Sequence, residues 1–350
     1  MDSTMRLTAI CFMLFLVFIP LSFSASGQAI KTTPFIQKEF KFSAGDYHLD
    51  GRLLLPDTLG RHPVIMNIWG SGPTRMEHYI ERSGILTRFT ENGYAVLLYD
   101  KPGSGASGGT LSENQLLRDR SKIARAALDS LKHNRFVNPD RIGLYGSSQA
   151  AYIMALLLET SRDISFIACW SCPMENSIEQ TAYQIRQYLL CAGRAPDLAE
   201  RAAQHYRNAL LAVEYAAYLP NAEFLNQIPE IRDELGWGEI IPATAWKPMD
   251  ADSEELLDPG RMFAQVSIPV LAIYGTLDKN INPNQAVQFL NRQQNKTIQT
   301  AWIPGADHNM MVGGSGCVQQ QLNGYREVDS PRRSGEFEKV LVQWLSSLAP

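Results

Sequence analysis

Apolar strands and amphipathic helices alternate along most of the chain. Continuous apolar runs end in glycine or aspartate at "HPVIMNIWG" (62–70), "YAVLLYD" (94–100) and "RIGLYG" (141–146). Such runs are typical of strands that are covered on both faces. Stretches of helical periodicity separate them. The alternation predicts a mostly parallel central sheet with helices on both of its faces.

The remaining elements follow from the same patterns. An alternating stretch with a turn at Ala44, Gly45 and Asp46 predicts a β-hairpin over 35–55. Further strands are expected at 164–171, 268–275 and 298–305. Helices are expected at 77–92, 112–134 with Ser112 as N-cap, 148–160, after Pro283 and at 335–348. Residues 312–336 are polar and predict a long loop.

The strand–helix rhythm stops between residues 174 and 255. This segment predicts three successive helices, at 176–193, 197–218 and 222–236. An all-helical block between two strands is best interpreted as a cap over the carboxyl edge of the sheet. The predicted core domain therefore consists of residues 25–173 and 256–350, with the cap as an insertion.

The N-terminus has the order of a secretory signal peptide. Arg6 is followed by an apolar run from Leu7 to Leu21 and then by small residues. We expect residues 1–24 to be removed, although cleavage after Ser26 and an uncleaved anchor are alternatives. Because the run is short for a membrane span and contains Pro20, cleavage is favoured. The expected location is therefore secreted or periplasmic, with no stable membrane span after cleavage.

Composition narrows the class of partner. The chain has 350 residues, of which 45% are hydrophobic, and a net charge of −4. The sequence has no strongly basic patch, so nucleic acid is not an expected partner. No His, Cys and Asp residues lie at metal-ligand spacing, so neither a metal nor an organic cofactor is expected.

Four cysteines follow the predicted signal peptide. Export would permit disulfides, but the pairing cannot be read from the sequence. The "CWSC" motif ends an apolar strand and is interpreted as structural or free thiols. The four are Cys169, Cys172, Cys191 and Cys317.

One of two adjacent serines is a candidate nucleophile. A serine on a tight strand-to-helix turn needs small residues two positions before and two positions after it. Ser148 has Gly146 and Ala150 at these positions, whereas Ser147 has the larger Tyr145 and Gln149. Ser148 is therefore favoured as the nucleophile. The alternative is that it only caps the following helix.

These residues resemble the α/β-hydrolase superfamily. "GSSQA" is similar to its G-x-S-x-G elbow, with alanine replacing the last glycine, and "LLYDKPGSGASGG" is similar to its D-x-R-G-x-G-x-S segment. The resemblance covers residues 35–173 and 256–350, and is to the esterase-like, prolyl-oligopeptidase-like and dienelactone-hydrolase-like branch. It implies the α/β-hydrolase fold and serine hydrolase activity.

The superfamily's chain order of serine, acid and histidine implies the other catalytic residues. Asp278 and His308 each follow a predicted strand, so both should lie at the carboxyl edge of the sheet. The alternatives are that Asp278 caps the next helix, that His308 is a surface residue, and that Asp307 is the acid. The resemblance favours the triad Ser148, His308 and Asp278.

Two backbone N–H groups are expected to hold the substrate oxyanion. One belongs to Gln149, which follows the nucleophile, and the other to Ser71 in "WGSGPTR", with Gly72 as the alternative. Arg75 in this loop could bind a substrate carboxylate. An ion pair with Asp100 or Glu77 is favoured instead.

The predicted function is that of an exported serine hydrolase that cleaves a small-molecule carboxylic ester through an acyl-enzyme. A peptide or acyl-amide hydrolase and a catalytically silent binding protein are the alternatives. The cap should select the substrate, and most of its aromatic residues are expected to form its own core. These residues are Tyr183, Tyr188, Tyr206, Tyr215, Tyr218, Phe224 and Trp237.

Overall fold

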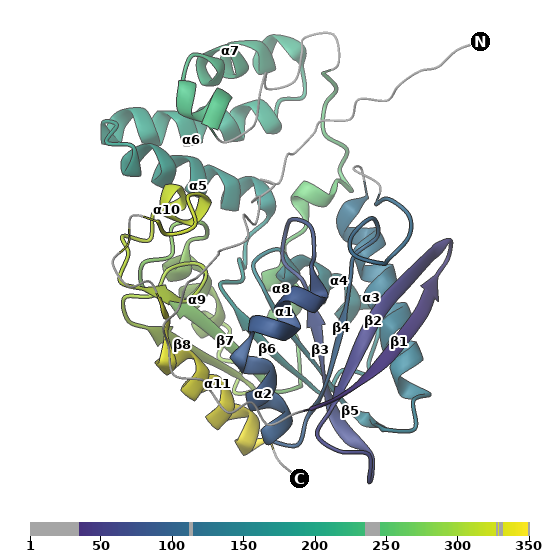
Figure 1. Cartoon of the computed structure of the whole chain (residues 1–350). Coiled ribbons are helices and arrows are strands. Elements are labelled where there is room, and N and C mark those ends of the chain that lie inside the picture. The colour runs from purple at the N-terminus through teal and green to yellow at the C-terminus, as the bar shows by residue number, and fades with distance from the viewer. Residues whose placement is uncertain (1–34, 112–114, 235–245, 327, 329–331, 349–350) are drawn as a thin grey trace, which may run out of the picture.

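The computed structural model describes residues 35–111, 115–234, 246–326, 328 and 332–348 (Figure 1). The signal peptide predicted for residues 1–24 lies outside these ranges. The predicted N-cap Ser112 and the cap residue Trp237 lie outside them too.

A large sheet forms the centre of the molecule. Its spatial order is β1-β2-β4-β3-β5-β6-β7-β8. The strands span Ile36–Ala44 (β1), Tyr47–Leu55 (β2), His62–Ile68 (β3), Ala95–Tyr99 (β4), Val137–Ser147 (β5), Phe166–Trp170 (β6), Val270–Gly275 (β7) and Ile298–Ile303 (β8).

All neighbouring strands from β4 to β8 run parallel, whereas the β1–β2 hairpin is antiparallel and β2 pairs antiparallel with β4. Parallel strands bring their carboxyl ends to one edge, where chemistry in such sheets is concentrated. The fold class predicted from the sequence is therefore confirmed.

Helices cover the two faces of the sheet (Figure 1). Along β3, Val64 and Met66 pack into one core, while Ile65 points into the other. The first core is covered by α3 (Leu116–Lys132), α4 (Ala150–Thr160), α8 (Pro259–Ala264) and α9 (Pro283–Arg292). The second is covered by α1 (Met76–Arg82), α2 (Gly84–Glu91) and α11 (Gly335–Ser347).

Two helices of the core domain differ from their predicted bounds. The helix predicted over 77–92 is interrupted at Ser83, whose extended backbone (φ −93°, ψ 100°) separates α1 from α2. The helix predicted from residue 112 begins at Leu116. The Glu254 carboxylate accepts the first N–H groups of α3, from Leu117 and Arg118, at 2.8 and 2.6 Å. A distant carboxylate therefore takes the place of a local cap.

Three cap helices lie between β6 and β7 in the chain: α5 (Ser177–Cys191), α6 (Pro196–Leu210) and α7 (Tyr215–Asn226). Figure 1 shows them as a separate layer at the top of the molecule. They share a core of their own that contains Tyr188, Tyr206 and Tyr218. The second predicted cap helix was wrong in extending to residue 218. The chain turns at 211–214, which lets tyrosines of both α6 and α7 enter one core.

The long loop predicted over 312–336 contains short regular elements. Helix α10 (Val318–Leu322) lies beside α5 (Figure 1), and β9 (Met311–Val312) pairs antiparallel with β10 (Arg332–Arg333). A polar composition therefore concealed these elements, because each is too short to show a hydrophobic period.

The cap is joined to the core domain by a disulfide between Cys191 and Cys317. Cys191 is the last residue of α5, and Cys317 immediately precedes α10. The other two cysteines, Cys169 and Cys172, are buried free thiols. The structure thus provides the pairing that the sequence left open, and the "CWSC" motif holds no disulfide.

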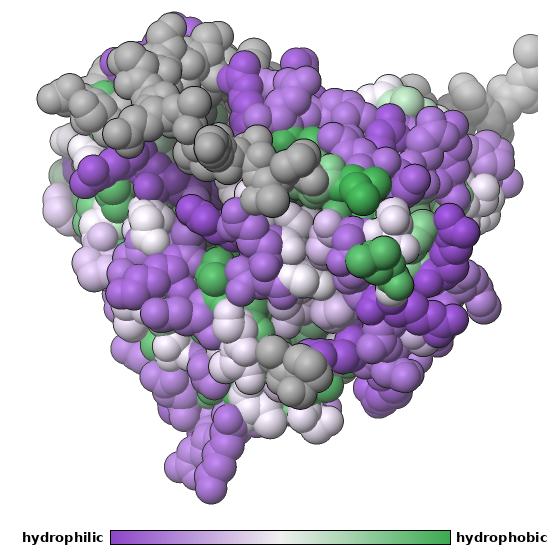
Figure 2. Space-filling model, turned by 60° about the horizontal axis from the view of Figure 1, so that its bottom comes forward, coloured by the Kyte–Doolittle hydropathy of each residue, from purple (hydrophilic) through white to green (hydrophobic). Residues whose placement is uncertain are grey.

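The described ranges contain no helix with the length and apolar character to cross a bilayer. Within the same residues, no group of three or more His, Cys, Asp or Glu side chains is placed to hold a metal ion. On the face shown in Figure 2, hydrophobic residues form small groups among hydrophilic ones.

We expect the Cys191→Ser/Cys317→Ser double variant to unfold at a Tm about 10 °C below that of the wild type, because a loop of 126 residues closed by a disulfide contributes about 4 to 5 kcal/mol. Thermal unfolding with and without dithiothreitol measures this. The reductant should lower the Tm of the wild type and leave the double variant unchanged. Alkylation of both cysteines in unreduced protein would contradict the pairing.

Candidate active site

Ser148 occupies a strained turn between β5 and α4. Its φ of 56° lies in the left-handed region, which non-glycine residues rarely adopt. A side chain at Gly146 would meet the Ile68 carbonyl oxygen at 2.5 Å and Ala150 Cβ at 2.8 Å. The turn therefore requires glycine at 146 and leaves room for no more than a small residue at 150. These are the constraints of a nucleophile elbow.

The Ser148 side chain is half-buried, whereas its neighbour Gln149 is buried. The Ser148 N–H donates to the Trp170 carbonyl at the end of β6, at 3.3 Å. The serine is therefore held at the carboxyl edge of the sheet and stays accessible to solvent.

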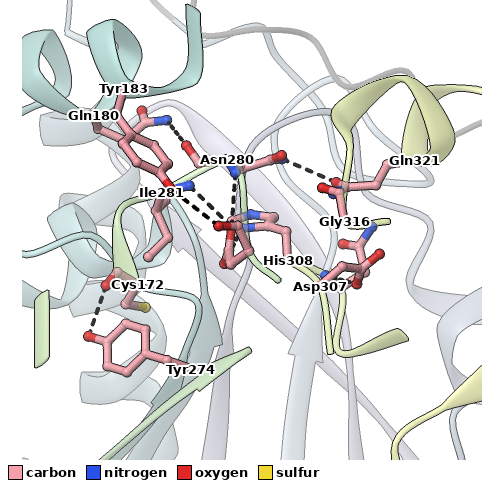
Figure 3. Close-up of polar contacts among 12 residues, drawn as sticks. Cys172, Gln180, Tyr183, Tyr274, Asn280, Ile281, Asp307, His308, Gly316 and Gln321 are labelled. Carbon is pink, nitrogen blue, oxygen red and sulfur yellow. Dashed lines mark hydrogen bonds and ion pairs between the residues drawn. The ribbon is translucent and has the colours of Figure 1, made fainter. Parts of the chain in front are cut away.

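Asp278 and His308 form a buried pair at the same edge of the sheet, and Figure 3 labels His308 there. Asp278 follows β7, and His308 follows β8. His308 Nδ1 lies 2.9 Å from Asp278 Oδ2 and 3.1 Å from Oδ1. Asp278 Oδ1 also accepts the N–H groups of Asn280 and Ile281, at 2.9 and 3.2 Å. The carboxylate is thus fixed in place and can orient the imidazole.

The neighbouring carboxylates raise the pKa of the His308 ring. Burial alone would lower the pKa of the ring, but the charge and hydrogen bond of Asp278, with a smaller contribution from Asp307, raise that pKa above its usual value. A histidine with this environment is suited to accept a proton.

Asp307, the alternative acid, has other partners. Its Oδ1 accepts the N–H groups of Asn309 and Met311, both at 2.9 Å, and its Oδ2 accepts the Tyr325 hydroxyl at 2.6 Å. Burial raises the pKa of the Asp307 carboxyl, although these donors oppose the shift. Asp307 therefore shapes the turn that carries His308, and Asp278 is the residue that contacts the ring.

The structure brings two of the three predicted catalytic side chains into hydrogen-bond contact. Among the described residues, neither Ser148 Oγ nor His308 Nε2 forms a hydrogen bond. The serine–histidine step of the triad therefore stays a prediction.

Helix α5 of the cap contacts the loop that carries Asp278. The Tyr183 hydroxyl donates to the Asp278 carbonyl at 3.3 Å, and Gln180 donates to the Asn280 carbonyl at 2.8 Å (Figure 3). Tyr183, one of the cap aromatics, thus forms a hydrogen bond with a predicted catalytic residue. Tyr215 and Phe224 pack against the cap core.

The loop after β3, with the predicted oxyanion donor Ser71, passes beside the elbow. A Cβ at Gly70 would lie 3.1 Å from the Ser147 carbonyl oxygen and 3.6 Å from Ser148 Cβ. Ser71 and Gly72 are both half-buried, and Gly72 has a φ of 77°. The loop is therefore close enough to share one small site with Ser148, and the role of Ser71 stays a prediction.

Sequence reasoning missed two buried cations beside this loop. Lys101 donates to the carbonyls of Gly70 and Gly72, and Arg120 donates to the Trp69 carbonyl and to Gln149 Oε1. The available signals were a lysine directly after a buried strand and an arginine on the apolar face of α3.

The ion pair favoured for Arg75 was wrong. Glu77 pairs with Arg52 at 2.7 Å, and Asp100 Oδ1 accepts the Met76 N–H at 2.9 Å. Arg75 is exposed and forms no ion pair with a described residue. Both carboxylates are engaged elsewhere, because Asp100 supports the start of α1 and Glu77 lies beside β2.

Solved structures of other proteins share this fold. An esterase of Pyrococcus furiosus is 17% identical with a TM-score of 0.53, and the alignment covers 89% of this chain and 91% of that one. VinJ is also 17% identical, with a TM-score of 0.52 and coverage of 89% and 99%. At this identity, the likeness concerns the fold alone.

No curated protein matches the sequence. Residues 74–313 match the family described as Hydrolase_4, serine aminopeptidase S33. This match spans more than half of the chain and includes the elbow, Asp278 and His308. The chain therefore belongs to the serine aminopeptidase S33-like family of α/β hydrolases.

Proposed function

We propose that this chain is a serine hydrolase that cleaves small carboxylic esters. The observation that carries the proposal is the strained, solvent-accessible Ser148 beside a buried, hydrogen-bonded Asp278–His308 pair at the same sheet edge. Strain at a turn is retained where a side chain has to be presented in one direction. A buried carboxylate–imidazole pair supplies the base that a serine hydroxyl needs.

In the proposed reaction, Ser148 Oγ attacks the ester carbonyl while His308 Nε2 accepts its proton. The N–H groups of Ser71 and Gln149 stabilise the oxyanion of the tetrahedral intermediate. His308 then donates the proton to the leaving alkoxide, which departs as an alcohol. Water attacks the acyl-enzyme in the same way, and the carboxylic acid is released. Asp278 stabilises the imidazolium throughout.

An ester is proposed because its alkoxide is a better leaving group than an amine, so less is demanded of the general acid. The runner-up is a small peptide or acyl-amide, which the description of the matched family favours. A phenylalanine p-nitroanilide assay separates the two. Preference for the anilide over the ester in kcat/KM would replace the ester proposal.

Export is part of the proposal. The N-terminal leader pattern and the Cys191–Cys317 disulfide both support an oxidising compartment, since disulfides persist there. N-terminal sequencing of protein collected outside the cytoplasm tests this. A mature protein that begins near residue 25 is expected, and retention of Met1 would contradict it.

We expect Ser148→Ala to lower kcat for p-nitrophenyl acetate at least about 1000-fold, because the nucleophile is lost. The matched control is Ser147→Ala, which should keep kcat within about threefold, since Ser147 is the last residue of strand β5 and Ser148 alone of the two has the left-handed backbone of the elbow. Equal losses in both variants would contradict the assignment of the nucleophile. Failure of the wild type to react with a fluorophosphonate would favour the catalytically silent alternative.

The pH dependence of kcat/KM should report His308. The base acts as neutral imidazole, so activity is lost as pH falls through its raised pKa, above the usual value of about 6.5. In Asp278→Asn, burial acts without the opposing charge, so the acid limb should move to lower pH. The maximal rate should fall about 10⁴-fold.

Asp307→Asn is the comparison variant for this profile. Its carboxylate has only a smaller influence on the ring, so the limb should move less than in Asp278→Asn. An acid limb that depends on Asp307 and not on Asp278 would contradict the assignment of the acid.

A further inference from the structure

A buried lysine holds the loop beside the elbow. The Lys101 side chain is 6% exposed, and its Nζ donates to the Gly70 carbonyl at 2.6 Å and to the Gly72 carbonyl at 2.5 Å. Among the described residues, no carboxylate lies within ion-pair distance of this ammonium. Burial, with a further contribution from the charge of Arg120, places the pKa of Lys101 well below its usual value.

A buried arginine joins the same loop to the residue after the nucleophile. Arg120 is 6% exposed and donates to the Trp69 carbonyl and to Gln149 Oε1. Burial lowers the pKa of Arg120 to about 10, although the Glu254 and Tyr99 charges oppose the shift. The two predicted halves of the oxyanion hole are therefore connected through one guanidinium.

The carbonyl contacts fix the direction of the N–H groups. In a trans peptide, the C=O and the following N–H point in opposite directions. Because the Gly70 carbonyl is directed at Lys101, the Ser71 N–H is directed away from it. The Gly70 Cα approaches Ser148 closely enough for an added Cβ to lie 3.6 Å from Ser148 Cβ. The loop and the elbow therefore adjoin each other.

A purely structural contact would not require two basic side chains. Their burial costs stability, and smaller neutral donors could satisfy the same carbonyls. Donors that fix the direction of backbone N–H groups are, by contrast, useful beside a developing oxyanion.

We propose that Lys101 and Arg120 are positioning residues for the oxyanion hole: Lys101 holds the Gly70 and Gly72 carbonyls so that the Ser71 N–H faces the reacting carbonyl, and Arg120 ties the loop to Gln149. This proposal rests on the serine hydrolase function proposed above. The D-x-R-G motif that this segment resembles has arginine where this chain has Pro102, since the segment reads Asp100, Lys101, Pro102 and Gly103. The proposal therefore assigns the support of the oxyanion loop to Lys101 and Arg120, which the resemblance did not indicate.

The test compares full-length wild type with Lys101→Met, Lys101→Arg and Arg120→Gln. Lys122→Met is the matched control, since that lysine is 69% exposed and pairs with Asp119 outside the site. Each protein is titrated with a fluorophosphonate so that kcat refers to functional sites only. The readouts are kcat and KM for p-nitrophenyl acetate, and the Kd of phenylboronic acid by calorimetry. The boronic acid forms a tetrahedral adduct with the serine and needs no turnover.

In Lys101→Met, kcat per titrated site should fall about 100-fold, while KM stays within about threefold, because an oxyanion contact acts in the transition state. The Kd of phenylboronic acid should rise by a similar factor. Lys101→Arg should recover part of both losses, since a guanidinium can donate to the same carbonyls. Arg120→Gln should change both readouts in the same direction, and Lys122→Met should change neither.

Unchanged kcat per titrated site in Lys101→Met, with only fewer titratable sites, would overturn the proposal in favour of a structural role. Equal increases in KM and in the Kd of the boronic acid, with kcat unchanged, would also overturn it. The two proposals fail separately. A wild type that hydrolyses no ester but loses boronic acid affinity in Lys101→Met would overturn the ester function and support the positioning role. A wild type that neither hydrolyses the ester nor binds the boronic acid would overturn both.

Discussion

The tight packing of β5 against α4 is the constraint on which the candidate site depends. Backbone and side-chain atoms surround Gly146 so closely that no Cβ fits there, and Ala150 fills the space left over. The chain turns sharply from strand β5 into helix α4 between Gly146 and Ala150, and at this turn the Ser148 backbone is held in the left-handed region. The packing energy of the buried parts of α4 and β5 maintains this strain, which is why an accessible serine can keep one direction.

Much of this site could be predicted from sequence because its residues follow buried strands. Asp278 and His308 were found by their positions after β7 and β8 and by the order that the superfamily resemblance implies. Lys101 and Arg120 escaped notice because their importance depends on burial and on carbonyl partners far away in the sequence. The helix breaks at Ser83 and at 211–214 were also missed. Residues 211–214 contain no glycine or proline, so tertiary packing ends that helix, whereas the Ser83-Gly84 pair was a local turn signal that the apolar periodicity outweighed.

The cap is connected to the site through backbone contacts and not only through its position above it. Tyr183 and Gln180 of α5 hold the carbonyls of the loop that carries Asp278. At the other end of the insertion, Glu254 caps α3, the helix that contains Arg120. Both ends of the inserted segment therefore support elements that position candidate catalytic groups. A change in cap packing would therefore alter the position of Asp278 through α5, and the position of the proposed oxyanion loop through Glu254 and α3.

The disulfide divides the chain into parts of different topology. The covalent ring closed by Cys191 and Cys317 contains most of the cap, β7, Asp278, β8 and His308, but not Ser148. The nucleophile, Ser71, Lys101 and Arg120 all belong to the linear segment before the ring. The proton-transfer pair therefore belongs to the covalent ring, whereas the nucleophile and the proposed oxyanion groups belong to the linear segment. Within the large sheet, these two parts of the chain are neighbours at the parallel pair of β6 and β7, so this strand pair places the nucleophile and the proton-transfer pair at one edge.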